Sequence, residues 1–329
     1  MNVPFMLSPA GKDYLWGGER LKKEYGKKLD MSPLAETWEC STHPDGPSIV
    51  RDGMYKGLTL TEVLREHPEY TGTHPDVRED RPGELPILVK LIDAGKDLSV
   101  QVHPDDEYAY VHEGGSRGKT EGWYVLDAAP DASLIYGLEF DLDPDSIRKY
   151  AAEGRMNDCL HRVPVKKDDV FYIKAGTIHA IGAGTLIAEI QENSNVTYRL
   201  YDYDRRDKDG NKRPLHMDKA LDVACLDKLP DPVQPMRVLK YEPGVARELL
   251  FRCRYFEVHR MLINADTDSA IAYKADELSF RVLLCVDGEG CVDDSIDIRR
   301  LGKGDCMFIP ADSVPLRLYG KLQLLDICG

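Results

Sequence analysis

The chain has 329 residues, of which 42% are hydrophobic, so it can bury a sizeable core in one large domain or in two ordinary ones. Its 57 Asp and Glu outnumber its 43 Lys and Arg, and the sequence has no basic tract, so nucleic acid is not expected as a partner. The start does not resemble a leader, no long apolar run occurs, and the eight cysteines are scattered, so we expect a cytoplasmic protein with free thiols and no membrane span.

Most of the chain has the period-2 alternation that is typical of β-strands, interrupted by Gly, Pro and Asp. Three segments have helical spacing instead. In chain order, the pattern predicts a helix over 58–67, strands over 85–94, 122–128 and 132–138, a helix over 144–154, strands over 169–176 and 185–191, a helix over 215–226, and strands over 277–292 and 306–311. The sequence therefore predicts a mainly β protein with a few helical insertions.

The segment 229–243 contains four prolines and little periodicity, which indicates a connector between two halves. We therefore expect one domain over 1–228 and a second over 244–329. An internal repeat supports two related halves, because 167–190 aligns with 303–326 at one constant offset, and both copies have a strand, turn, strand pattern. Such a repeat is typical of two small β-barrels or jelly rolls.

Several polar residues lie where a predicted strand begins or ends. Gln101 and His103 are two apart, so they share one face of a strand that stops at Pro104. Glu121 opens another strand, and His179 follows a turn that contains glycine. Two His, one Glu and one Gln suit zinc, and they would also accept Mn, Fe, Co or Ni. Taken singly, a histidine in a strand more often forms ordinary hydrogen bonds than binds a metal, and Glu121 could be a solvated strand end.

Several motifs in fixed order resemble the type I mannose-6-phosphate isomerases, in their short bacterial form. The motifs are AETWECSTHPDGPS (35–48), LSVQVHPDD (98–106), GKTEGWYVL (118–126), AGTIHAIGAG (175–184), YRLYDYDR (198–205) and NKRPLHMDKALDV (211–223). The resemblance implies a cupin-like fold, so we expect a metal-bearing cupin domain followed by a degenerate second barrel. It implies one zinc ion per chain, held by Gln101, His103, Glu121 and His179, and interconversion of mannose 6-phosphate and fructose 6-phosphate through an enediol.

The turn before His179 departs from the general cupin signature. Asp168 stands where glycine is usual, and Lys174 stands where proline is usual. The second copy of the repeat has Gly304 at the first of these positions, but it has Pro315 in place of the histidine. If His179 acts in the first barrel, the second barrel has lost that function.

The resemblance also implies cations for a phosphosugar. Arg199 and Lys119 match the family's active-site cations, and Ser99 matches a residue associated with phosphate binding. A net charge of -14 does not oppose an anionic ligand, because two or three converging cations outweigh a distant average. A salt bridge to Asp202 or Asp204 is the alternative role for Arg199.

The remaining candidates concern the sugar pocket and proton transfer. Trp16 could form a wall of the sugar pocket, or it could be core, and the same holds for Trp38. His43, on a predicted turn, is our first candidate for proton transfer. Three carboxylates compete with it, because a carboxylate beside a metal can also act as a base: Glu36, Glu39 and Asp204.

Two other functional classes remain open at this point, and the sequence does not predict an oligomeric state. Cupin barrels with His and Glu ligands also include Fe(II) dioxygenases and other phosphosugar isomerases. A non-catalytic sugar-binding cupin is the third class. Such a protein would have no need of the full set of ligands and cations.

Overall fold

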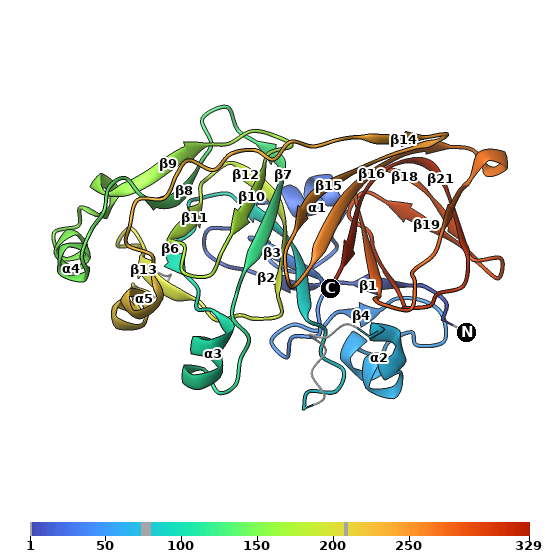
Figure 1. The fold of residues 1–329 in the computed structure, drawn as a ribbon, viewed down its shortest axis with the longest axis horizontal. Helices are drawn as coiled ribbons and strands as arrows, with labels where there is room; N and C mark the ends of the chain where they lie inside the picture. The colour runs from blue at the N-terminus through green and yellow to red at the C-terminus, as the bar shows by residue number, and fades with distance from the viewer. Residues whose placement is uncertain (1, 74–79, 207–209) are drawn as a thin grey trace.

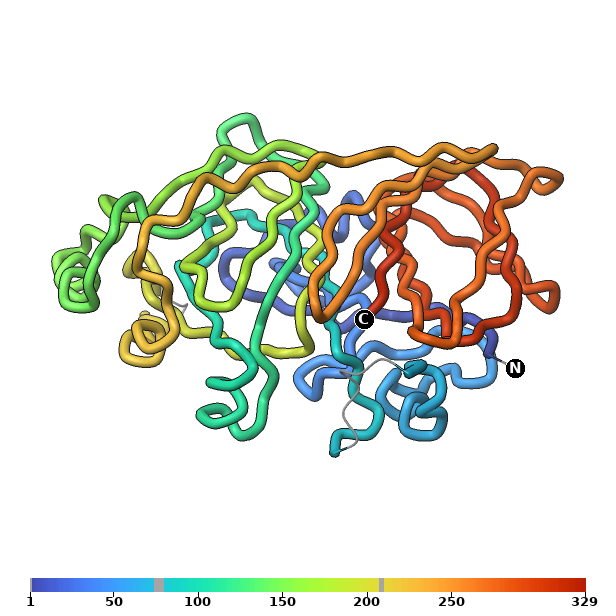
Figure 2. The backbone as a smooth tube through the Cα atoms, in the orientation of Figure 1, coloured from blue at the N-terminus to red at the C-terminus, as the bar shows by residue number. Residues whose placement is uncertain are grey.

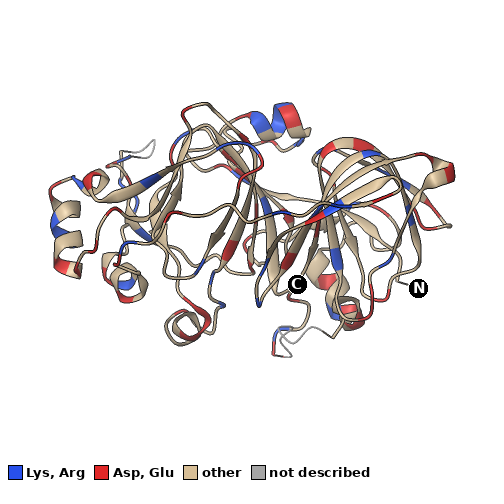
Figure 3. Cartoon of the chain, turned by 45° about the horizontal axis from the view of Figure 1, so that its top comes forward, with Lys and Arg blue, Asp and Glu red and all other residues tan. Residues whose placement is uncertain are grey.

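The computed structural model describes residues 2–73, 80–206 and 210–329. Two β lobes lie side by side, and helices flank them (Figure 1). Basic and acidic side chains are spread over both lobes, and neither sign gathers on one of them (Figure 3). Among these residues, no helix is long and apolar enough to cross a membrane.

The first lobe consists of two antiparallel sheets. One has the order β10-β7-β12-β5-β3-β2, and the other has the order β13-β6-β11-β8-β9. Their strands are β2 (Ala10–Lys12), β3 (Glu36–Cys40), β5 (Ile87–Ala94), β6 (Val100–Val102), β7 (Glu121–Ala128), β8 (Ser133–Leu138), β9 (Leu160–Pro164), β10 (Val170–Ile173), β11 (His179–Ile181), β12 (Thr185–Glu192) and β13 (Tyr198–Tyr201).

Strand β12, in the larger of these two sheets, has one face toward the hydrophobic core and the other toward the interior of the first lobe. All eight of its residues are buried, and it pairs with β5 on one side and with β7 on the other. Leu186, Ala188 and Ile190 point into a core shared with the second lobe, whereas Ile187 belongs to a different core cluster. Because alternate side chains point to opposite faces, Glu189 faces the interior of the first lobe together with Ile187.

The second lobe is one larger sheet of order β14-β15-β16-β21-β18-β20-β1-β4, with β17 on β21 and β19 on β18. A second cluster of buried apolar side chains, among them Met261, Leu283 and Leu324, forms its own core. Its strands are β1 (Phe5–Ser8), β4 (Ile49–Val50), β14 (Lys240–Glu242), β15 (Val245–Arg252), β16 (Glu257–Ala265), β17 (Ile271–Tyr273), β18 (Arg281–Asp293), β19 (Ile298–Gly302), β20 (Cys306–Ile309) and β21 (Leu316–Cys328).

Strand pairing crosses the domain boundary that the sequence suggested. β1 pairs with β20, with Phe5 opposite Phe308, and β4 pairs with β1. The first fifty residues therefore contribute strands to the second lobe. The chain between the lobes runs across the top of the molecule in Figure 2, and residues 240–242 of the expected connector form β14.

The three expected helices are present as α2 (Leu60–Glu66), α4 (Pro144–Ala152) and α5 (Met217–Val223). Thr59 and Glu62 form a capping box at the start of α2, and Asp143 caps α4. Two further short helices were not predicted, because their polar sequences lack an apolar stripe. These are α1 (Arg20–Tyr25) and α3 (Asp106–His112), and the 3-10 turns are η1 (Pro68–Thr71), η2 (Met156–Asp158) and η3 (Thr267–Ser269).

The internal repeat corresponds to matching structure. β10 and β20 begin and end at equivalent positions of the two copies. Asp168 and Gly304, which are equivalent in the repeat, have φ values of 70° and 90°. This left-handed backbone explains why glycine is usual there. Asp168 holds the same conformation while its carboxylate accepts hydrogen bonds from the Tyr124 hydroxyl and, at 3.2 Å, from Arg260.

Candidate metal centre

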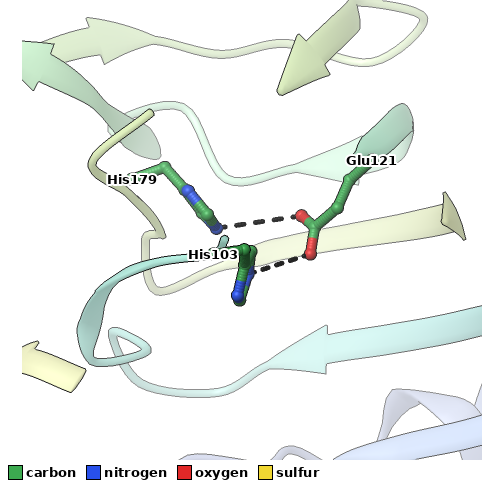
Figure 4. Close-up of side chains that lie close together, drawn as sticks. All are labelled: His103, Glu121 and His179. Carbon is green, nitrogen blue, oxygen red and sulfur yellow. Dashed lines mark ion pairs between the residues drawn. The ribbon is translucent and has the colours of Figure 1, made fainter. Parts of the chain in front are cut away.

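Three buried side chains from separate strands converge inside the first lobe (Figure 4). Their possible ligand atoms all lie within 4.8 Å of one another. His103 Nε2 lies 3.1 Å from Glu121 Oε1, and His179 Nε2 lies 3.8 Å from Glu121 Oε2. His103 directly follows β6, and Glu121 and His179 are the first residues of β7 and β11. Residues distant in the sequence thus form one compact set of donors.

Gln101 lies beside this cluster on β6. Its Cα is the register partner of His179, and its side-chain nitrogen lies 3.4 Å from His179 Nε2. Rotating the Gln101 side-chain amide by 180° would put its oxygen where its nitrogen now lies. The orientation of such an amide is normally assigned from its hydrogen bonds. The structure therefore brings together all four ligands expected from the sequence.

The hydrogen bonds of the two histidines fit a metal ion. His103 Nδ1 lies 2.9 Å from the carbonyl oxygen of Val196, and His179 Nδ1 lies 2.8 Å from that of Thr177. A carbonyl only accepts, so each Nδ1 carries the proton and each Nε2 presents its lone pair to the centre. Burial lowers the pKa of both rings, that of His103 to about 3, which keeps them neutral as metal binding requires.

Glu121 is the only acidic member of the cluster, and its charge is supported from several sides. Burial opposes ionisation, but Lys119 and the nearby imidazoles hold the pKa of Glu121 well below its usual value. Trp123 Nε1 donates to Glu121 Oε2 at 2.9 Å, and Lys119 Nζ contacts Oε1. Two neutral nitrogens, an amide and one carboxylate form a donor set that suits a divalent ion such as zinc.

A pocket of about 260 Å³ opens over this centre. Gln101 and Lys119 lie among its lining residues, together with Ser99, Arg199 and Trp16. The residues expected to bind substrate therefore line one cavity that borders the metal ligands.

Arg199 is placed to receive an anion. Its Nε lies 3.3 Å from Ser99 Oγ, and Nη1 donates to the carbonyl oxygen of Pro214 at 2.9 Å. No carboxylate of the described residues forms an ion pair with it, because Asp202 pairs with other arginines and Asp204 pairs with Lys212. The alternative role, a salt bridge to one of these acids, is absent from the described part of the chain.

Two buried charged residues of the same pocket were not found from the sequence. Lys90 and Glu189 lie 3.0 Å apart, and both are at least 96% buried. Burial and the negative charge of Glu121 raise the pKa of Glu189 to about 7. The signal that could have found them was a single charged residue in the middle of each of two apolar strands, LVKLI (88–92) and LIAEI (186–190).

The candidates for proton transfer that the sequence suggested lie in different parts of the structure. His43 lines a neighbouring cavity of about 540 Å³, where its ring packs edge-on against Trp38 at 5.6 Å. Glu36 lines the smaller pocket. Glu39 is fully buried against Lys27, 2.5 Å away.

Asp204 and Trp38 lie elsewhere. Asp204 lines an outer cavity, where it pairs with Lys212 at 2.8 Å. Trp38 is fully buried and donates its Nε1 proton to Glu36 at 2.8 Å. Of the carboxylates weighed from the sequence, only Glu36 reaches the pocket over the metal ligands.

Comparisons with known proteins point to one family. The family model "Phosphomannose isomerase type I, catalytic domain" matches residues 5–121. Mannose-6-phosphate isomerase ManA of Bacillus subtilis is 36% identical over 98% of both chains, and the mannose-6-phosphate isomerase of Streptococcus mutans is 36% identical over 99% of this chain and 98% of its own. A crystal structure of the Bacillus subtilis mannose 6-phosphate isomerase superposes with a TM-score of 0.89, at 34% identity and 99% coverage of both chains.

A more distant structural relative has the same fold. This mannose 6-phosphate isomerase, bound with zinc and yttrium, superposes with a TM-score of 0.75 at 16% identity, covering 99% of both chains.

Proposed function

Because the chain belongs to the type I mannose-6-phosphate isomerase family, we propose that it interconverts mannose 6-phosphate and fructose 6-phosphate in the pocket over His103, Glu121 and His179. One observation carries the proposal. The pocket that Gln101 and Lys119 line, beside the other three metal donors, also contains an arginine that no carboxylate of the described residues neutralises.

Gln101, His103, Glu121 and His179 would hold one zinc ion, because their neutral nitrogens and single carboxylate fit its preferred ligands. When bound, zinc supplies a Lewis acid that polarises the sugar oxygens at C1 and C2. Lys119, 3.1 Å from His103 Nε2, would place its ammonium group beside the same oxygens and stabilise the charge of the enediol.

The other end of the pocket would hold the phosphate. The guanidinium of Arg199 is planar and can donate two parallel hydrogen bonds to phosphate oxygens. Ser99 Oγ, 3.3 Å from Arg199 Nε, would add a hydroxyl donor. Trp16, which is 4% exposed, would cover one side of the sugar.

We assign the proton transfer between C2 and C1 to Glu189 in place of His43, because His43 lines the neighbouring cavity. A raised pKa of about 7 lets Glu189 take a proton and return it near neutral pH. Lys90, at 3.0 Å, would stabilise its carboxylate form. Glu36, on the same pocket wall, is the alternative carrier.

The test is a coupled assay of both sugar phosphates on zinc-reconstituted protein, with His103→Ala and Arg199→Ala variants. We expect the first variant to lose zinc and turnover together, since one of four donors is removed. The second should keep zinc and lose turnover, with a raised KM. Normal turnover by either variant would contradict the site. Oxygen uptake that requires Fe(II) would favour a dioxygenase, and absence of any turnover would favour a sugar-binding protein.

We propose that the reaction takes place in the cytoplasm, and the free thiols support this location. All eight cysteines are free, and four of them are buried. Unpaired cysteines in this number are typical of a reducing compartment. Fractionation of cells that express the native chain would test the location.

A further inference from the structure

Two arginines compete for one buried carboxylate directly after β13. Asp202, which is 5% exposed, accepts from Arg213 Nε at 2.8 Å and from Arg213 Nη2 at 2.5 Å. It also accepts from Arg205 Nη2 at 2.5 Å and from Arg205 Nε at 3.1 Å. One negative charge therefore faces two guanidinium groups, and Arg199 lies nearby without a carboxylate partner among the described residues.

The two partners of Asp202 both line the outer cavity beside Asp204, but they differ at the pocket over the metal ligands. Arg213 lines the pocket over the metal ligands, together with Ser99 and Arg199. Arg205 lines only the outer cavity among the pockets described, and its Nη1 bonds to the carbonyl oxygen of Asp97. Only Arg213 of this pair is therefore in position to meet a ligand bound beside Arg199.

Each of the two arginines that line the pocket keeps one terminal nitrogen that is not used in a hydrogen bond to the described residues. Asp202 occupies Nε and Nη2 of Arg213, and Ser99 and Pro214 occupy Nε and Nη1 of Arg199. Within the described residues, Nη1 of Arg213 and Nη2 of Arg199 have no hydrogen-bond partner. Each guanidinium is thus held by other groups and keeps one terminal nitrogen for a ligand.

The local charge favours a dianion. Three guanidinium groups against one carboxylate leave an excess of two positive charges in a partly buried region. Burial and the positive charge of Arg213 lower the pKa of Arg199, which is the expected effect of unbalanced like charges. A phosphate monoester, which carries close to two negative charges at neutral pH, would remove this imbalance.

We propose that Arg213, fixed by Asp202, is a second phosphate-binding residue that makes the pocket select phosphorylated over free sugars. The proposal rests on the proposed function of the same pocket. Arg199 and Arg213 would each give one hydrogen bond to different phosphate oxygens, and Asp202 acts as the positioning residue that fixes the Arg213 fork. Loss of Arg213 should therefore weaken phosphate binding while the metal donors stay in place.

The test compares Arg213→Gln with Arg205→Gln as the matched control, because both changes remove one arginine from Asp202 but only Arg213 lines the pocket. Binding of inorganic phosphate to the zinc-loaded chain is measured by calorimetry, beside KM and kcat for mannose 6-phosphate.

We expect Arg213→Gln to weaken phosphate binding and raise KM by about tenfold or more, as for a lost hydrogen bond to a charged group. Zinc content should be unchanged, and kcat should fall much less than KM rises. Arg205→Gln should stay within about twofold of the parent, a factor that corresponds to only a few tenths of a kcal/mol.

Equal effects of the two variants, or unchanged phosphate binding in Arg213→Gln, would overturn the proposal. Because Asp202 would keep only Arg205 as a partner and the loop could be destabilised, Arg213→Lys provides a second variant with the charge kept. It should bind phosphate with intermediate affinity, since lysine gives a point charge without the fork. Phosphate binding is measured without turnover, so a chain that bound phosphate through Arg213 but did not isomerise the sugar would contradict only the proposed function.

Discussion

At the scale of single residues, Trp123 links Glu121 to Glu189, the proposed proton carrier. Its Nε1 proton is shared between Glu121 Oε2 at 2.9 Å and Glu189 Oε1 at 3.1 Å. Trp38 makes a similar bond. It is also fully buried, and it also donates to a glutamate two residues earlier, Glu36. The two tryptophans therefore form a natural pair for separating metal binding from packing.

Trp123→Phe should weaken zinc binding by about 10–100-fold, because partners of the ligands orient them and tune their charge. Trp38→Phe removes an equally buried indole whose acceptor is not a metal donor, and it should leave zinc affinity unchanged. Competition with a chromophoric chelator measures both. Equal losses in the two variants would mean that packing, rather than the bond to Glu121, sets the affinity.

The residues found from the sequence and those missed differ in a physical respect. Gln101 and His103 interrupt an apolar pattern at a strand end, where polar atoms signal a site. Glu189 and Lys90 lie inside strands, where a lone charge is masked by its apolar neighbours. Arg213 lies in a loop, and which cavity a loop residue lines depends on tertiary packing that no local pattern encodes.

At the scale of elements, a carboxyl pair joins β12, α3 and the second lobe. Glu192, the last residue of β12, accepts from the backbone N–H of Thr120 at 2.8 Å. Asp106, the first residue of α3, accepts from the Tyr255 hydroxyl at 2.9 Å. Burial, and then the charge of Asp106, raise the pKa of Glu192 to about 8. Three elements therefore meet at a glutamate that stays protonated at neutral pH.

This carboxyl makes folding depend on pH. The folded chain keeps the Glu192 proton up to about pH 8, whereas the unfolded chain loses it near the ordinary value of 4.5. The free energy of unfolding should therefore fall as pH rises from about 5 to about 8, by about 1.4 kcal/mol per pH unit at most. Glu192→Gln, which cannot ionise, should flatten this slope in urea titrations.

An exposed carboxylate provides the control for this titration. The Glu277 side chain is exposed, so Glu277→Gln should leave the slope as in the parent chain. An unchanged slope in Glu192→Gln would show that Glu192 is ionised in the folded state.

A helix could be predicted where its sequence has one clear pattern. Helices α2, α4 and α5 combine an apolar stripe or an N-cap with adequate length, and all three were expected. Helix α3 was missed although Asp105 caps it, because Ala109 is its only buried residue and little of its sequence faces a core. Strand order across the lobes was not predictable, since pairing between distant segments leaves no local trace.

At the scale of the whole molecule, the second lobe depends on the first residues of the chain. Phe5, which is 2% exposed, stacks on Phe308 with ring centroids 5.3 Å apart and meets Tyr55 edge-on at 6.0 Å. Without β1, one edge of β20 would lose its hydrogen-bonding partner. The two lobes are therefore parts of one interlaced structure.

Phe5→Ala should lower the free energy of unfolding by about 3–5 kcal/mol, because a large aromatic leaves a cavity in this core. KM for mannose 6-phosphate should stay unchanged below the melting temperature, since the pocket lies in the other lobe. Thermal unfolding and kinetics measure the two effects. Ile296→Ala, at a side chain 69% exposed on the same lobe, is the control and should change neither. A raised KM without lost stability would contradict this separation.

The pairing of β1 with β20 also has a consequence for biosynthesis. Phe5 leaves the ribosome about 300 residues before Phe308, its register partner. At roughly 5–20 residues per second, that interval lasts about 15–60 s. Throughout it the apolar strand Phe5–Ser8 has only the two-residue strand β4 to pair with, so the nascent chain offers a binding segment to chaperones until translation is nearly finished.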